Sequence, residues 1–208
     1  DDLSDGDWKT CRRYYIEYDT DLINIGSTYI DIDEVDMSRK QTFIDFFDWV
    51  INWEITNNCK ADRYLLWTAS YGWGWRGSQI DYMDNEIANT CCDDGCSMST
   101  IDLADAISHF YYKSGHKIDI ILFTTCLMNE LEVLYQIKDY VKFVVGSEEL
   151  VHDELDLGVY EIMQDFVSNY SLESSELARR IVKIKPDGFN TLSAIDISWH
   201  WCHDRFFF

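Results

Sequence analysis

The largely apolar stretch of residues 118–125, which Cys126 follows directly, constrains the fold more than any other part of the sequence. It is rich in Ile and follows a turn-like Ser114-Gly115 pair, a pattern typical of a buried strand in a parallel sheet. Parallel strands carry catalytic and ligand-binding groups at their carboxyl ends, where the loops meet. Cys126 therefore has two interpretations, a thiolate nucleophile or a small core side chain, and a single Cys does not decide between them.

Strand and helix patterns alternate along the rest of the chain. β-branched and aromatic runs predict strands at about residues 12–18, 63–67, 141–145 and 190–197. Apolar residues at helical spacing predict helices at about residues 40–53, 100–110, 131–137, 160–167 and 174–183. The expected N-caps of the first two helices are Ser38 and Ser99. The alternation predicts an α/β fold whose largely parallel sheet is covered on both faces, with a long loop at about residues 73–98.

Composition and charge limit the partners. The 208 residues, 47% of them hydrophobic, suit one globular domain with a substantial core. The formal charge of −21 disfavours nucleic acid and anionic membrane surfaces, since phosphate binding needs clustered Lys and Arg. It favours cationic partners such as Lys- or Arg-bearing peptides, although an acidic surface also serves solubility alone. No apolar run approaches the roughly 20 residues that span a bilayer.

The amino end and the cysteines leave the compartment open. The chain begins without Met and without a recognisable signal peptide, which is expected of a fragment or a mature form. There are seven Cys, so at least one lies outside an intrachain disulfide. Cys91, Cys92 and Cys96 form a cluster without a second ligand pair. We expect a local disulfide or free thiols there rather than a zinc site.

Two segments carry a resemblance to a known family. Residues 61–73 read ADRYLLWTASYGW, and residues 119–128 read DIILFTTCLM. They resemble the motifs of the clostripain family of cysteine peptidases: a strand ending in Trp-Asp-His-Gly-Ser-Gly-Trp, and a later Asp-Leu-Ile-Gly-Phe-Asp-Ala-Cys-Leu-Met. Supporting matches occur in the family's order at residues 36–37, 42–46, 130–140, 144–149 and 192–196.

The resemblance implies a caspase-like fold, a three-layer α/β/α sandwich with a largely parallel central sheet. In intact members it implies cleavage after Arg or Lys, and secretion or a periplasmic location. Residues 1–208 would form one partial peptidase domain that lacks the family's opening strand and helix, with further chain after Phe208. No cofactor is required, but some relatives need Ca²⁺. The candidate calcium ligands, which lack EF-hand spacing, are Asp81, Asp84, Asp93 and Asp94.

The catalytic pair that the resemblance implies is incomplete. Cys126 occupies the nucleophile position, but the position of the activating His falls on Ala69, and residues 67–73 contain no His. A thiol of pKa about 8.5 is mostly protonated at neutral pH unless a neighbouring imidazole favours the thiolate, and a methyl group cannot do this. We therefore expect peptidase activity to be impaired or lost.

Specificity is altered in the same way. The family Asp two residues before the nucleophile helps to hold a basic substrate side chain, and here this residue is Thr124. Losing a carboxylate removes the charge-assisted bond that selects Arg or Lys. Asp153 and Glu154 are the nearest acids that could compensate, unless they form only a solvated turn. Self-processing between the two motifs is not expected, because Arg76 is the only Lys or Arg in residues 76–112.

One other His is a candidate surrogate base. His152 follows the strand next to the Cys126 strand and should share its rim of the sheet, and a base must come within about 3 Å of the thiol, directly or through one water. His109 and His116 are expected at the opposite rim. The other side chains considered lie in an aromatic tail or have no base of their own: His200, His203 and Ser70.

Three functions remain open on this reading. The first is a pseudopeptidase that keeps the clostripain scaffold and some peptide binding without efficient hydrolysis. The second is an active cysteine peptidase that uses His152 as its base. The third is an interaction domain without catalysis, whose acidic surface binds basic partners in a salt-dependent manner.

Overall fold

The computed structural model describes residues 10–18, 25–69, 72, 74–75, 92–93, 96–151, 159–184 and 188–198. The chain divides into two compact units, Asp1–Asp36 and Met37–Phe208. In the first unit, β1 (Arg12–Tyr14) pairs antiparallel with β2 (Tyr29–Asp31). The expectation of one domain over residues 1–208 stays a prediction.

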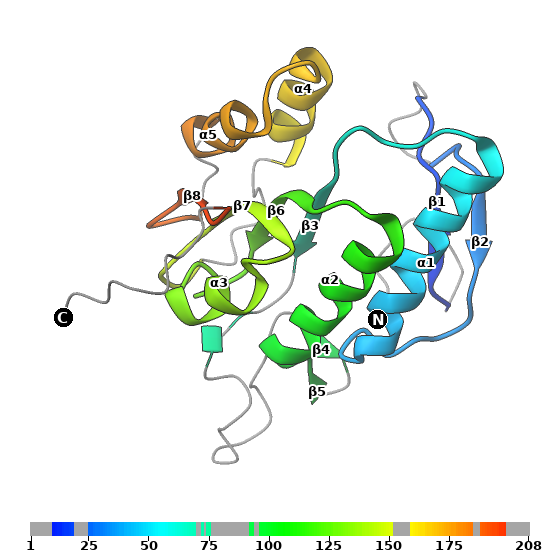
Figure 1. The fold of residues 1–208 in the computed structure, drawn as a ribbon, viewed down its shortest axis with the longest axis horizontal. Helices are drawn as coiled ribbons and strands as arrows, with labels where there is room; N and C mark the ends of the chain where they lie inside the picture. The colour runs from blue at the N-terminus through cyan, green and yellow to red at the C-terminus, as the bar shows by residue number, and fades with distance from the viewer. Residues whose placement is uncertain are drawn as a thin grey trace. The chain divides into compact units, whose positions relative to one another are not determined.

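The second unit is built on a four-stranded sheet in the order β3-β6-β7-β8 (Figure 1). Its strands are β3 (Leu65–Ala69), β6 (Ile118–Thr124), β7 (Val141–Gly146) and β8 (Ser193–Asp196). The first three are parallel, and β8 runs antiparallel beside β7. Every residue of β6 is buried, as its continuous apolar sequence predicts for a central parallel strand. The largely parallel sheet is confirmed.

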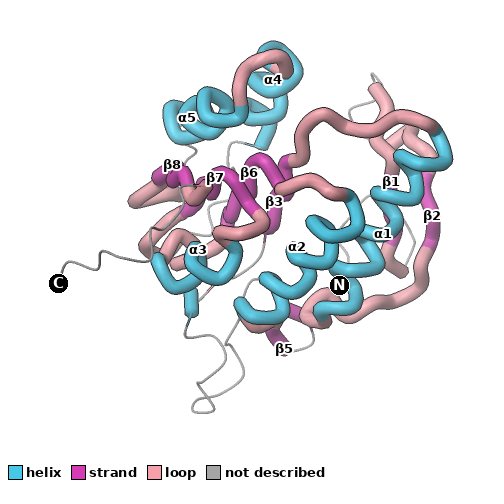
Figure 2. Tube along the Cα trace, in the orientation of Figure 1, coloured by secondary structure: helices cyan, strands magenta, loops and turns pink. Residues whose placement is uncertain are grey.

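Helices cover both faces of this sheet (Figures 1 and 2). One face carries α1 (Lys40–Asn57), α2 (Thr100–Ser114) and α3 (Leu131–Ile137). The other carries α4 (Val159–Asn169) and α5 (Ser174–Ile184). Side chains alternate along β6, so that Ile121 and Phe123 join the first core while Ile120 and Leu122 join the second. The predicted three-layer α/β/α sandwich is confirmed.

The structure differs from the sequence-based expectation at several element ends. Ser99 caps α2 as predicted, its Oγ accepting the N–H of Asp102 at 3.0 Å. The prediction of Ser38 as the cap of α1 was wrong, because the N-cap is Arg39 and makes no side-chain cap hydrogen bond. In the first unit β1 is shorter than predicted, ending at Tyr14. Within the predicted loop, β4 (Cys92–Asp93) pairs with β5 (Cys96–Ser97).

Strand β3 begins and ends two residues later than predicted. Arg63, expected inside the strand, instead donates to the carbonyl oxygens of Tyr170 and Leu172, just beyond α4. The carbonyl oxygen of Tyr64 accepts the N–H of Asp119 at 2.9 Å and so leads into the pairing of β3 with β6. At its other end β3 extends to Ala69, which pairs with Thr124 at the end of β6.

Candidate functional site at the carboxyl rim of the sheet

Three parallel strands end at one rim of the sheet. Strand β3 ends at Ala69, β6 at Thr124 and β7 at Gly146. The register sets Ala69 directly beside Thr124, and Cys126 follows two residues later. The structure therefore brings together the three positions that the sequence singled out on β3 and β6. Ala69 is exposed, so no core packing requires its small side chain.

Thr124 has no charge to offer a ligand, and its hydroxyl is already engaged. The residue is 4% exposed. Its Oγ1 donates to the carbonyl oxygen of Thr68 at 3.0 Å and accepts the indole N–H of Trp67 at 3.1 Å. Thr124 thus holds β6 to β3 rather than presenting a free polar group at the rim.

The turn that carries Cys126 has an unusual backbone. Leu127 has φ of 59°, in the left-handed region that costs a residue with a Cβ on the order of 1 kcal/mol. Its N–H donates to the carbonyl oxygen of Glu149 at 3.2 Å. Contacts with the segment after β7 therefore hold this turn in a conformation that the local sequence alone does not favour.

Asn129 fastens the turn to two strands. Its backbone N–H donates to the carbonyl oxygen of Ser147 at 3.1 Å. Its Nδ2 donates to the carbonyl oxygen of Gly146 at 3.2 Å and to Oγ of Ser193 at 2.7 Å. The side chain is 2% exposed, and its Oδ1 accepts no hydrogen bond from the described residues. Sequence analysis missed this residue, although an Asn directly after Cys-Leu-Met in an apolar setting was an available signal.

Two glycines bring the chain after β3 against the same turn. A Cβ added to Gly72 would lie 2.3 Å from the carbonyl oxygen of Cys126. Gly74 has φ of 59°, and its Cβ would lie 2.2 Å from Oε2 of Glu130. Gly72, which lies in the first motif, therefore needs glycine for close backbone approach, and Gly74 needs it for its left-handed φ.

Among the described residues, the sulfur of Cys126 hydrogen-bonds to backbone and not to an imidazole. Cys126 is half-buried and its thiol is free. Its Sγ accepts the N–H of Val151 at 3.1 Å and lies 3.6 Å from the carbonyl oxygen of the same residue. These are the hydrogen bonds of this sulfur within the described part of the chain.

The two histidines that the structure describes lie elsewhere. Nε2 of His109, on α2, lies 2.7 Å from Oδ1 of Asp48 on α1. Burial raises the pKa of that carboxyl, but hydrogen bonds with Lys113 and His109 outweigh it and hold the pKa below its ordinary value. His116 precedes β6 and packs its ring against Tyr64, with centroids 5.9 Å apart. Both are thus away from the carboxyl rim, as expected.

Several predicted site residues fall outside the described residues. They are the surrogate base His152, the acids Asp153 and Glu154, the tail residues His200 and His203, and Ser70, Arg76, Cys91, Asp81, Asp84 and Asp94. Their proposed roles stay predictions. Within the described ranges, no group of three or more His, Cys, Asp or Glu side chains is arranged to hold a metal ion. Among those same residues, no helix combines the length and apolar character needed to cross a membrane.

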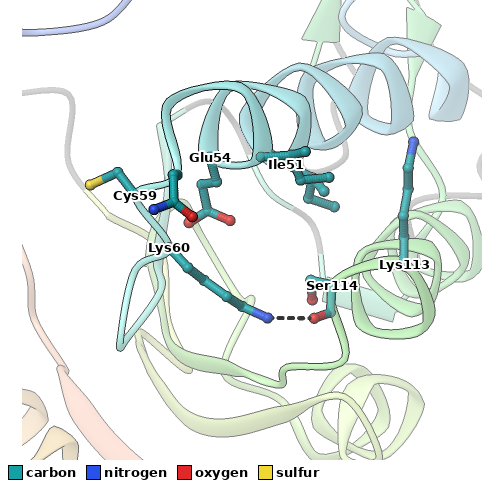
Figure 3. A pocket seen from close by; sticks show the side chains of 8 residues that line it. Ile51, Glu54, Cys59, Lys60, Lys113 and Ser114 are labelled. Carbon is teal, nitrogen blue, oxygen red and sulfur yellow. Dashed lines mark hydrogen bonds between the residues drawn. The ribbon is translucent and has the colours of Figure 1, made fainter.

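Two pockets lie in the second unit. One, of about 380 Å³, lies at the carboxyl rim and is lined by residues that include Glu148, Phe189 and Thr191. The other, of about 400 Å³, lies where α1 and α2 end, with Glu54 and Lys60 in its wall (Figure 3). There Glu54 accepts the phenol O–H of Tyr64 at 3.0 Å. Burial first, and then this contact, raise the pKa of Tyr64. Neither pocket was predicted from the sequence.

Comparison with solved structures agrees with the fold. A secreted C11 cysteine protease from Bacteroides thetaiotaomicron, in complex with an irreversible peptide inhibitor, matches with a TM-score of 0.58 and 20% identity, over 86% of this chain and 51% of that one. The B. thetaiotaomicron protease "iotapain" gives 0.44 at 21% identity over 66% and 38% of the two chains. An inactive zymogen C11 protease from Parabacteroides distasonis gives 0.40 at 20% identity over 76% and 47%. This chain thus spans about half or less of each of these proteins.

A search of curated proteins found no match to this chain. A family model, in contrast, matches most of it. The model of the clostripain family, Peptidase_C11, matches residues 9–199 and so includes both motifs and all the described strands and helices. The chain therefore belongs to the clostripain family of cysteine peptidases.

Proposed function

We propose that this chain is a clostripain-type domain that binds peptides but does not hydrolyse them efficiently. The observation that carries the proposal is the residue beside Thr124 at the end of β3, where the family motif has its His and this chain has Ala69. Cys126 is present at the end of the neighbouring strand, on a turn held in place by Asn129. The scaffold that positions a nucleophile is kept, and the group that would activate it is missing.

The chemistry of thiol attack explains why one missing side chain is enough. The thiolate is the nucleophile, and an adjacent imidazole both favours it and later protonates the leaving amine. The Val151 N–H at 3.1 Å from Sγ can hydrogen-bond the sulfur, but an amide neither accepts nor delivers a proton during turnover. Removing the general acid–base alone lowers a rate by roughly 10²–10⁴.

Selectivity for Arg or Lys is expected to be lost with the carboxylate at position 124. The Thr124 hydroxyl is bonded to Thr68 and Trp67, so it cannot replace a carboxylate that pairs with a guanidinium. Asp153 and Glu154 are the acids proposed to bind any basic side chain that remains preferred. The peptide ligand would then be held mainly by backbone contacts and by shape.

Restoring the two lost groups tests the proposal. The double variant Ala69→His with Thr124→Asp should cleave an Arg-containing peptide, whereas the native chain should show no turnover above that of its own Cys126→Ala variant. The matched control is Ala69→Gln with Thr124→Asp, which adds a polar side chain without a titrating base. Native turnover that depends on Cys126 would contradict the proposal.

A second candidate, an active peptidase with His152 as its base, is favoured by one contact. The residue that bonds the Cys126 sulfur is Val151, the immediate neighbour of His152 in the sequence. In that case native turnover should be present and His152→Gln should abolish it, with His109→Gln as the matched control.

The location of the domain is proposed by analogy. Like the secreted B. thetaiotaomicron protease, the domain would act outside the cytoplasm.

Calcium binding and an alternative partner can be tested directly. Ca²⁺ bound through Asp81, Asp84, Asp93 and Asp94 should raise the Tm, and a chelator should reverse that rise. If the acidic surface rather than a peptide groove is the binding site, affinity for basic peptides should fall steeply between about 0.05 and 0.5 M salt.

A further inference from the structure

The sulfur of Cys126 is hydrogen-bonded on one side by the backbone of a single residue. Val151 contributes both its N–H, 3.1 Å from Sγ, and its carbonyl oxygen, 3.6 Å from Sγ. A thiol is one weak donor and one weak acceptor, so this residue uses both of its capacities. A ligand that is to reach the sulfur from this side must displace Val151.

Residues 147–151, called here the 147–151 segment, are fastened at their start. Ser147 is fully buried, and its Oγ accepts the N–H of Glu149 at 3.0 Å. The same Oγ lies 2.9 Å from Oγ1 of Thr191, in the stretch that leads into β8. The carbonyl oxygen of Glu149 accepts the N–H of Leu127, the residue after the cysteine. The segment therefore lies along the Cys126 turn, bonded to it and to the chain before β8.

Phe189 holds the far end of the segment. Val151 forms an isolated antiparallel bridge with Phe189, outside the regular sheet. The Phe189 side chain is 7% exposed. In contrast, Glu148, Glu149 and Leu150 are exposed, so the middle of the segment adds little packing. Few buried contacts hold such a segment, which is the property of regions that open locally without global unfolding.

We propose that the 147–151 segment is an autoinhibitory cover over one side of Cys126, and that a peptide reaches the sulfur from that side only after the pairing of Val151 with Phe189 opens. This concerns access to the thiol and goes beyond the proposed loss of hydrolysis. It holds for this chain with or without a functioning base.

Alkylation of the native chain with iodoacetamide, followed by peptide mapping, tests the cover. Cys59 is exposed and supplies an internal reference. The Cys126 thiol should react at least about tenfold more slowly than Cys59, because reaction requires a local opening. Phe189→Ala keeps the backbone bridge but removes the buried side chain that holds residue 189 in place. The bridge should then open more often and raise the Cys126 rate by about tenfold or more, with the Cys59 rate unchanged.

Two controls separate opening from general loss of stability. Phe43 is also 7% exposed but lies in the core on the other face of the sheet, so Phe43→Ala should leave the Cys126 rate low. Val151→Ala keeps the backbone N–H and should have little effect, whereas Val151→Pro removes this donor and should accelerate labelling.

Two outcomes would overturn the cover. One is a native Cys126 that reacts as fast as Cys59. The other is a Phe43→Ala rate increase as large as that of Phe189→Ala. Neither depends on whether the Ala69→His, Thr124→Asp variant cleaves peptides, so failure of the cover and failure of the proposed function are distinguishable.

Discussion

The two ends of strand β6 differ in how their polar groups are satisfied. At the amino end the Asp119 carboxylate, 4% exposed, accepts hydrogen bonds from Lys142 Nζ at 2.7 Å, Ser174 Oγ at 3.1 Å and the Tyr64 N–H at 3.0 Å. At the carboxyl end the Thr125 hydroxyl, 1% exposed, has no hydrogen-bond partner among the described residues, and Leu127 adopts a left-handed conformation.

This difference separates a structural end from a candidate functional one. Buried charges are tolerated when partners satisfy them, and Asp119 joins β6 in this way to β7, to α5 and to Tyr64, the residue before β3. Unpaired polar atoms and backbone strain persist where the surrounding structure enforces them, as at ligand sites. The contrast predicts that changes at the amino end alter stability, while changes at the carboxyl end alter the reactivity of Cys126.

The largest expected effect is at the amino end. Asp119→Ala leaves the Tyr64 N–H and the Ser174 hydroxyl without their acceptor, so we expect a loss of roughly 3 kcal/mol in the free energy of unfolding, measured with urea. The control is Asp139→Ala, which removes an exposed pair with Lys138 and should cost no more than about 1 kcal/mol. Equal losses in the two variants would remove the distinction between a buried node and a surface pair.

The next effect concerns the turn around the cysteine. Asn129→Ala removes the side-chain bonds to Gly146 and Ser193 and should cost about 2 kcal/mol. Unlike Asp119→Ala, it should also change the alkylation rate of Cys126 under conditions where both variants are fully folded. If Asp119→Ala changes that rate as much, the two ends do not divide their roles as we infer.

An effect of similar size is expected where the chain after β3 meets the turn. Gly72→Ala places a Cβ 2.3 Å from the carbonyl oxygen of Cys126, so backbone must shift, at a cost of about 1–3 kcal/mol. Gly115→Ala is the contrasting control at the amino end. Its Cβ would meet nothing within 4 Å, but its φ of 74° still makes the change strained. Only the first should alter Cys126 labelling, as followed by mass spectrometry.

The smallest effect is expected at an ion pair that lies away from both ends of β6. Arg180 Nε on α5 donates to Asp165 on α4 at 2.7 Å. This hydrogen bond is the main reason why the pKa of Asp165 lies below its ordinary value. Because the pKa is lower in the folded state, the ionised carboxylate stabilises the fold at pH values above the unfolded pKa of about 3.9. This stabilisation is lost as the pH falls through the folded pKa.

Comparing Asp165→Asn with the native chain checks that sign. The variant should be less stable by roughly 0.5–1 kcal/mol at neutral pH, since the pair is partly exposed. The difference should shrink as the pH falls below about 4, as urea titrations at several pH values would show. A difference that grows in acid would contradict the assignment.

Local patterns were enough to predict much of the fold. The run from Ile118 to Thr124 has no polar alternation, and the structure buries all of it in the middle of the sheet. Ser99 was predicted as a cap from its own neighbours, and it is one. The same reasoning gave a wrong cap at Ser38, because α1 begins after Arg39 without a capping side chain. Packing of Phe43, Phe47 and Ile51 stabilises this helix instead.

The site was only partly predictable for a related reason. Cys126, Thr124 and Ala69 were found from two motifs, and strand register brings them to one rim. Asn129 and Val151 were not found. The position of Asn129 directly after Cys-Leu-Met was a local signal, but the partners of both residues lie far away in the sequence. The Asn129 side chain bonds a residue 64 positions away, and Val151 bonds one 25 positions away.

The sequence by itself determined that a parallel central strand ends beside a cysteine, and that no imidazole stands at the matching position of the neighbouring strand. Both follow from the order of residues, because an apolar run and the absence of a His are local features that can be recognised without knowing any tertiary contact. Only the tertiary structure decided what covers the sulfur and what holds its turn. Those contacts join segments distant in the chain, and their geometry exists only once the sheet has assembled.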